Sequence, residues 1–227
     1  MLELPFELIQ RLSLPQAHAL RRALAVIAEE LPGVYADNVR DQRPRDNANI
    51  FGLRVAFHLW AALDERQPDL GEARIIEANN ARYLAVAEFK VAIHKLGHHV
   101  ADDIHGSFPE GSPTQRSYAQ RNANQLTLFE SAPEAPLPDE RAFALRDLVV
   151  GHFGNSEDGL AKWYLGAPTY DDNGHPRWAW LAPQPVAANE PARQVTPYSE
   201  REPATVDVKP RARPADAQTS SDGSPGA

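Results

Sequence analysis

The 227-residue sequence contains no cysteine, no excess of basic residues and no long apolar run. The absence of cysteine excludes disulfide bonds, thiolate nucleophiles and cysteine-ligated structural zinc. Lys and Arg number 23 against 31 Asp and Glu, for a formal net charge of −8, which argues against broad capture of nucleic acid through its phosphates. No run of about 18 apolar residues and no basic n-region with an apolar h-region occurs. We therefore expect a cytoplasmic protein without a membrane partner.

Two segments in the N-terminal part carry apolar residues at the spacing of an amphipathic helix. The first is Ser13–Leu31, with Ser13 as its N-cap, and Pro32-Gly33 is expected to end it. The second begins at an N-cap provided by Asp46 or Asn47 and continues to about Leu63. The apolar stripe of this second helix consists of Ile50, Leu53, Phe57 and Trp60.

Alternation of apolar and polar residues predicts strands in two separate groups. The predicted strands are residues 74–78, 81–86, 88–94, 145–153, 160–165 and 177–181. No segment of helix length separates the strands within either group, which is typical of antiparallel meanders. In the third strand Phe89, Val91 and Ile93 point one way, so one face of the sheet is predicted to meet the helices and the other to be polar.

These elements predict an α+β domain in which two N-terminal helices pack on an antiparallel sheet. Residues 1–107 supply the helices and the first meander, and residues 143–183 supply a second meander that completes the same domain. Between them, residues 108–142 are polar and rich in proline, and we expect a long flexible connector there. Proline, alanine and mixed charges dominate residues 184–227, which predicts a disordered tail.

The predicted connector contains one apolar pentapeptide, Gln125-Leu-Thr-Leu-Phe129. It resembles the motif with which bacterial polymerases, mismatch-repair proteins and replication regulators bind the DNA sliding clamp, and it matches every specified position of the pattern Gln-Leu-x-Leu-Phe. The resemblance covers five residues and implies that Gln125, Leu126, Leu128 and Phe129 contact the clamp. In an extended segment, Leu128 and Phe129 would be apolar anchors and the Gln125 amide would fix the register.

The resemblance implies a non-enzymatic binding or regulatory protein that associates with DNA indirectly, through the clamp, and needs no cofactor. Its setting would be replication, repair, or conflict with phages and mobile elements. Two alternatives remain open, a short strand or clip in which Leu126 and Leu128 pack on the protein's own core, and an antitoxin-like protein-binding module. Residues 151–160 are similar to uncharacterised actinobacterial proteins, which implies only a bacterial origin.

An enzymatic alternative rests on Asp69, Glu88 and Lys90, which resemble the metal-dependent nuclease signature of the restriction-endonuclease type. In that family an Asp and a Glu bind Mg²⁺ and the Lys positions or activates water. Glu88 and Lys90 share the polar face of a predicted strand, as this chemistry requires. Asp69 departs from the pattern because it lies in an apparent loop, and a cross-strand charge pair is the competing interpretation.

A histidine-rich segment, residues 94–105, offers imidazole and carboxylate groups of the kind that bind transition metals. The candidate ligands are His94, His98, His99, Asp102 and His105. Gly97 and the strand predicted through His94 argue against one continuous helix, and the pattern His-Glu-x-x-His is absent. We therefore expect a polar turn with hydrogen-bonding histidines, with a metal site as the alternative.

Overall fold

The structure is a computed structural model, which describes residues 2, 4–43, 46–78, 81–99, 104, 113–130, 142–171 and 173–186. Of residues 113, 114 and 127–130 it describes the backbone alone. The predicted turn at Asn79-Asn80, Asp102, His105, residues 108–112 and 131–141 of the predicted connector, and residues 187–227 of the predicted tail lie outside this set. The described elements belong to one compact unit, Met1–Arg193.

A six-stranded sheet forms the centre of this unit, in the order β1-β2-β3-β4-β5-β6. The strands are β1 (Arg74–Ala78), β2 (Ala81–Val86), β3 (Phe89–Gly97), β4 (Asp147–Asn155), β5 (Gly159–Tyr170) and β6 (Pro176–Gln184). The α+β class is confirmed. The sheet is mixed, however, because β3 and β4 run parallel while every other neighbouring pair is antiparallel. Parallel neighbours need a long crossover connection. Here the connection contains a helix that was not predicted from the sequence, α4 (Pro113–Glu130).

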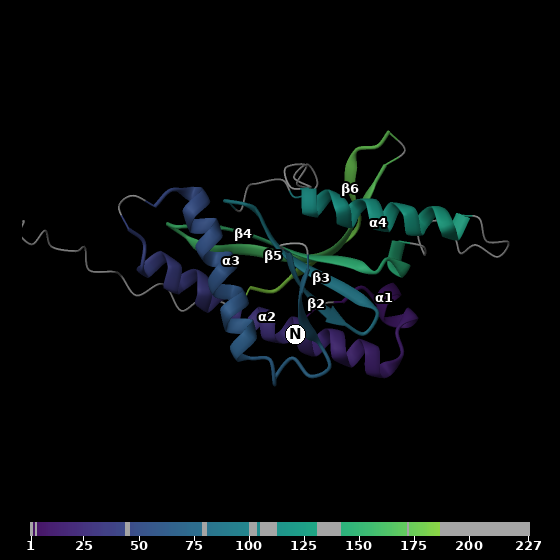
Figure 1. The fold of residues 1–227 in the computed structure, drawn as a ribbon, viewed down its shortest axis with the longest axis horizontal. Helices are drawn as coiled ribbons and strands as arrows, with labels where there is room; N and C mark the ends of the chain where they lie inside the picture. The colour runs from purple at the N-terminus through teal and green to yellow at the C-terminus, as the bar shows by residue number, and fades with distance from the viewer. Residues whose placement is uncertain are drawn as a thin grey trace, which may run out of the picture. The chain divides into compact units, whose positions relative to one another are not determined.

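Helices cover both faces of the sheet. Figure 1 shows α1 (Phe6–Arg11) and α2 (Leu14–Arg40) on one side and α4 on the other. The alternation in β3 is confirmed, since Phe89, Val91 and Ile93 lie in the main core. The other face is not simply polar, because Ala92, Val149 and the α4 residue Tyr118 form a second buried cluster. None of the described helices is long and apolar enough to span a bilayer.

Helix α2 begins as predicted and ends nine residues later than predicted. The Ser13 side chain accepts a hydrogen bond from the Gln16 backbone N–H, and the Gln16 side chain accepts one from the Ser13 backbone N–H, which completes a capping box. The helix then continues through Pro32 to Arg40. The prediction that Pro32-Gly33 ends it was wrong because the turns beyond them bury Val34 and Tyr35, and this packing outweighs the local cost of proline.

Replacing Gly33 with alanine tests this continuation of α2. Gly33 is exposed in the helix interior, and a methyl group added to it would meet no atom within 4 Å. Alanine is favoured over glycine inside a helix by about 0.5–1 kcal/mol. We expect Gly33→Ala to raise the free energy of unfolding by about that amount in urea denaturation. A loss of stability would indicate that the helix ends at Gly33 in a conformation that alanine does not tolerate.

Helix α3 (Ala48–Glu65) begins at Asn47, whose side chain accepts hydrogen bonds from the Asn49 and Ile50 backbone N–H groups. Its buried residues are Phe51, Val55, Leu59 and Leu63. Most of the predicted stripe faces the other way, since Ile50, Leu53 and Phe57 are 39%, 72% and 72% exposed. Its fourth residue, Trp60, packs partly buried against the main core. The helix carries two apolar stripes at helical spacing, and spacing alone does not tell which one meets the sheet.

Candidate functional site

The clamp-like pentapeptide lies at the C-terminal end of α4 and is helical. This corrects the prediction of a flexible connector for residues 113–130. This helix was not predicted because its sequence lacks an apolar stripe. The helix is held on the sheet mainly by polar side chains. Gln125 donates from Nε2 to the Ala144 carbonyl over 3.0 Å, and its Oε1 accepts from the Arg146 backbone N–H over 3.3 Å. Leu126 packs partly buried against the main core.

Gln125 and Leu126 therefore contact the protein's own body, as the clip interpretation expected for Leu126. Gln125 also borders a surface hollow of about 200 Å³ that Arg11, Glu88 and Arg146 line. The side chains of Leu128 and Phe129 lie outside the described residues. The described half of the motif is thus held by two hydrogen bonds to main-chain atoms near η1 (Ala142–Ala144).

Two neighbouring polar residues of α4, Arg121 and Asn122, hold the helix against the start of β4. Asn122 is fully buried, and its Nδ2 donates to the carbonyls of Asp147 and Pro168 over 2.8 and 2.7 Å. Its Oδ1 accepts from the Asp147 backbone N–H over 3.2 Å. Arg121 forms an ion pair with the buried Asp147 carboxylate at 2.6 Å, and its guanidinium lies 4.6 Å from the centre of the Tyr118 ring.

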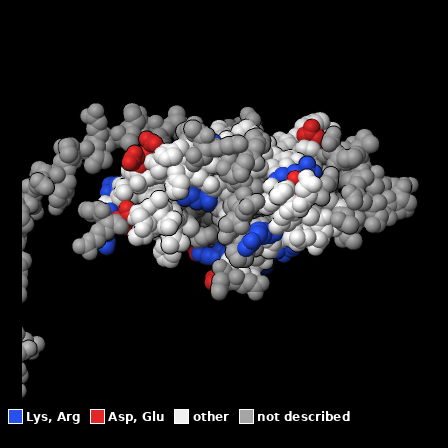
Figure 2. Space-filling view, turned by 90° about the horizontal axis from the view of Figure 1, so that it is seen from above, with Lys and Arg blue, Asp and Glu red and all other residues white. Residues whose placement is uncertain are grey.

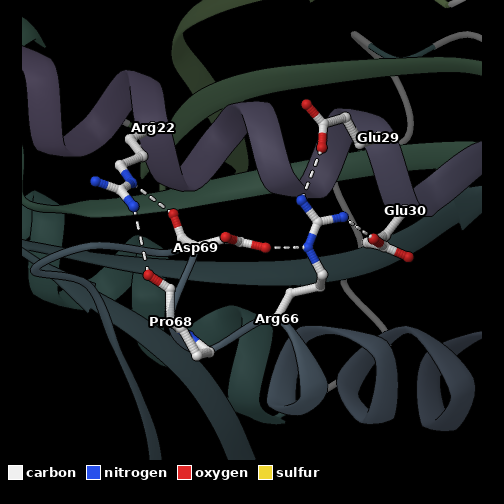
Figure 3. Close-up of polar contacts among 6 residues, drawn as sticks. All are labelled: Arg22, Glu29, Glu30, Arg66, Pro68 and Asp69. Atoms are coloured by element: carbon white, nitrogen blue, oxygen red, sulfur yellow. Dashed lines mark hydrogen bonds and ion pairs between the residues drawn. The ribbon is translucent and has the colours of Figure 1, made fainter.

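The predicted nuclease residue Asp69 contacts two arginines, Arg22 of α2 and Arg66 at the end of α3. Figure 3 shows Arg66 between the Asp69 carboxylate and the carboxylates of Glu29 and Glu30. Arg22 donates from Nε to the Asp69 carbonyl over 2.6 Å. The hydrogen bond that Arg66 donates to Asp69 is the largest cause of a pKa of Arg66 above its ordinary value, followed by those it donates to the two glutamates. Asp69 is thus part of a surface charge network.

Glu88 and Lys90 have partners elsewhere. Glu88 pairs with Arg146 at 3.2 Å. Lys90 lies on the α4 face of β3, where its ammonium is 5.7 Å from the centre of the Tyr83 ring, whereas Asp69 contacts the helices that cover the opposite face. The described residues therefore do not bring two carboxylates and the lysine together as Mg²⁺-dependent cleavage requires.

In the described part of the histidine segment, His94 lies near the end of β3, and His98 and His99 form a bend after it. Burial lowers the pKa of His94 to about 4, and its ring packs 6.1 Å from that of Tyr118. His98 Nδ1 lies 2.9 Å from Lys95 Nζ, and Asn155 Nδ2 donates to the His98 carbonyl over 3.1 Å. Across the described part of the chain, no three His, Asp or Glu side chains gather as a metal site.

A buried polar pair in the main core was not predicted from the sequence. Tyr35 of α2 and His152 of β4 are joined by a hydrogen bond of 2.8 Å between Oη and Nδ1. Burial, with smaller contributions from Lys95 and His94, lowers the pKa of His152 to about 3, and burial raises the pKa of Tyr35. His152 is therefore neutral at physiological pH.

A second missed feature is a hollow of about 170 Å³ between α4 and the β2–β3 hairpin. Its described lining includes Tyr83, Lys90, Ser117, Tyr118 and Arg121. Tyr83 and Lys90 lie on neighbouring predicted strands, where Lys90 is opposite Ala85 and Tyr83 is its diagonal neighbour. The other three side chains come from α4, which was not predicted.

No protein family, curated protein or solved structure matches this chain in the comparisons made with each.

Proposed function

We propose that this is a non-enzymatic binding protein that docks on the bacterial DNA sliding clamp through Gln125–Phe129. The observation that carries the proposal is the match of the pentapeptide to all four specified positions of the clamp-binding pattern. Its place would be DNA replication, repair, or conflict with phages and mobile elements, with DNA contacted indirectly. The acidic net charge of −8 is compatible with a partner that itself encircles the DNA.

The contacts of Gln125 determine how such docking would proceed. An extended clamp-bound segment requires the end of α4 to unwind and Gln125 to leave the Ala144 carbonyl and the Arg146 N–H. Each of these hydrogen bonds has a net value of about 0.5–1.5 kcal/mol. The clamp would have to supply more than this, because a segment that changes conformation on binding spends part of its interaction energy on the change.

The test is calorimetric titration of a purified bacterial sliding clamp with the full chain and with a Leu128→Ala, Phe129→Ala variant. Because two apolar anchors dominate small interfaces of this kind, we expect the variant to lose at least about 2 kcal/mol of binding free energy, or more than tenfold in affinity. Clamp binding that survives this double substitution would overturn the proposal, as would absence of binding by the folded wild-type protein.

A matched control is available on α3. Leu53 and Phe57 are also a leucine and a phenylalanine, and both are 72% exposed. A Leu53→Ala, Phe57→Ala variant removes the same two types of side chain from a different surface. It is expected to bind the clamp as the wild type does, so a general loss of apolar surface would be distinguished from loss of the motif.

A further inference from the structure

The hollow between α4 and the β2–β3 hairpin has cations and hydroxyl groups in its wall. Lys90 and Arg121 supply two positive charges, and Tyr83, Ser117 and Tyr118 supply hydroxyls. No carboxylate lines it among the described residues. Figure 2, seen from the α4 side of the unit in Figure 1, shows Lys and Arg side chains at several places on the described surface. The lining favours an anion.

The two cations are held differently. Arg121 is held in place by other side chains. Its Nε and Nη2 donate to the same Asp147 oxygen over 3.0 and 2.6 Å, and its Nη1 donates to Ser117 Oγ over 3.2 Å. Asp147 therefore offsets the charge of Arg121. Within the described part of the chain Lys90 forms no ion pair, and its ammonium packs near the Tyr83 ring. Among the described residues that line the hollow, the charge of Lys90 is thus the one that no carboxylate offsets.

The neighbouring tyrosines complete a set of donors. Tyr118 is 3% exposed, and burial raises its pKa above the ordinary value, so its hydroxyl keeps its proton at neutral pH. Charge-assisted hydrogen bonds from an ammonium and neutral bonds from phenols suit the oxygens of a phosphate group. Placement of these groups on a helix and two strands limits the side-chain freedom that binding must remove.

We propose that this hollow binds a phosphate group, with Lys90 as the principal charged contact and with Tyr83 and Tyr118 as hydrogen-bond donors. The phosphate is either a free ion or the terminal group of a nucleotide, since both present the same oxygens. The site is separate from the pentapeptide, so the inference does not depend on clamp binding.

The test is NMR titration of the full-length ¹⁵N-labelled protein with inorganic phosphate and, in a second arm, with a nucleoside monophosphate. Sodium chloride of equal ionic strength provides the reference. Saturable shifts of the amides around Tyr83, Lys90 and Ser117 are expected with at least one probe. Tighter binding of the nucleotide would assign the phosphate to a nucleotide, and equal or tighter binding of the inorganic ion to free phosphate.

Lys90→Met is expected to weaken binding by about tenfold, as for the loss of one charge-assisted contact. Lys162→Met is the matched control, because Lys162 is also a strand lysine above an aromatic ring, at 4.5 Å from the Phe153 centre, outside the hollow. We expect it to change the affinity by less than about twofold. Absence of saturable shifts with either probe, or equal affinity of Lys90→Met and the wild type, would overturn the proposal.

Discussion

Replacing Asn122 with alanine is expected to lower the free energy of unfolding by about 3 kcal/mol or more, which would be among the largest effects of any single substitution in this protein. The reason is that one fully buried side chain satisfies three main-chain groups, the N–H and carbonyl of Asp147 and the carbonyl of Pro168. A buried polar group left without a partner costs about 1–3 kcal/mol, and alanine leaves three of them.

The control for this prediction is Asn124→Ala, two residues along the same helix. Asn124 is exposed, and its Oδ1 accepts an exposed hydrogen bond from Gln120 Nε2 over 3.0 Å. Surface substitutions of this kind usually stay within about 0.5 kcal/mol. Urea denaturation of both variants measures the difference. Similar stabilities for the two would show that Asn122 does not anchor α4 to β4.

Lowering the pH from 7 to 5 is expected to remove about 2 kcal/mol of stability through His152 alone. The folded-state pKa of His152 is about 3, below the value of about 6.5 for an unfolded chain. The unfolded state therefore binds a proton in this interval that the folded state does not. The contribution of His152 is complete above about pH 7 and declines as the pH falls toward 3. His94, with its pKa of about 4, changes stability in the same direction.

A Tyr35→Phe, His152→Leu double variant isolates this effect. It removes both partners of the buried hydrogen bond at once, which avoids leaving one polar group unpaired. Denaturation at pH 7 and pH 5 should then show a loss smaller than that of the wild type by about 2 kcal/mol. The exposed residue His175 provides a control through His175→Gln. An unchanged pH dependence in the double variant would mean that His152 takes up its proton in the folded state.

Both proposed binding features depend on how α4 is held. Tyr118 and Arg121 form one wall of the hollow, and Gln125 begins the pentapeptide one turn further along the same helix. Asn122 lies between them and supplies the buried anchor. Clamp docking needs the end of this helix to unwind, whereas phosphate binding needs its middle to stay in place. The two features therefore make different demands on one element.

Much of the local structure follows from the sequence alone. The alternation of apolar residues located all six strands, and two of them, Arg74–Ala78 and Ala81–Val86, have the predicted limits. The caps at Ser13 and Asn47 located the starts of α2 and α3. These signals are readable because the spacing of side chains and the hydrogen bonding of caps act over a few residues.

Only the tertiary structure decided the features that concern function. In the folded chain Ile50, Leu53 and Phe57 face outward. Residues 113–130 form a helix within the connection that joins the parallel strands β3 and β4, and Gln125 has hydrogen-bond partners near η1. The tertiary structure also separated Asp69 from Lys90 and brought Lys90 beside Arg121. Each of these outcomes depends on contacts between residues far apart in the chain, and neither local propensity nor periodicity carries information about such contacts.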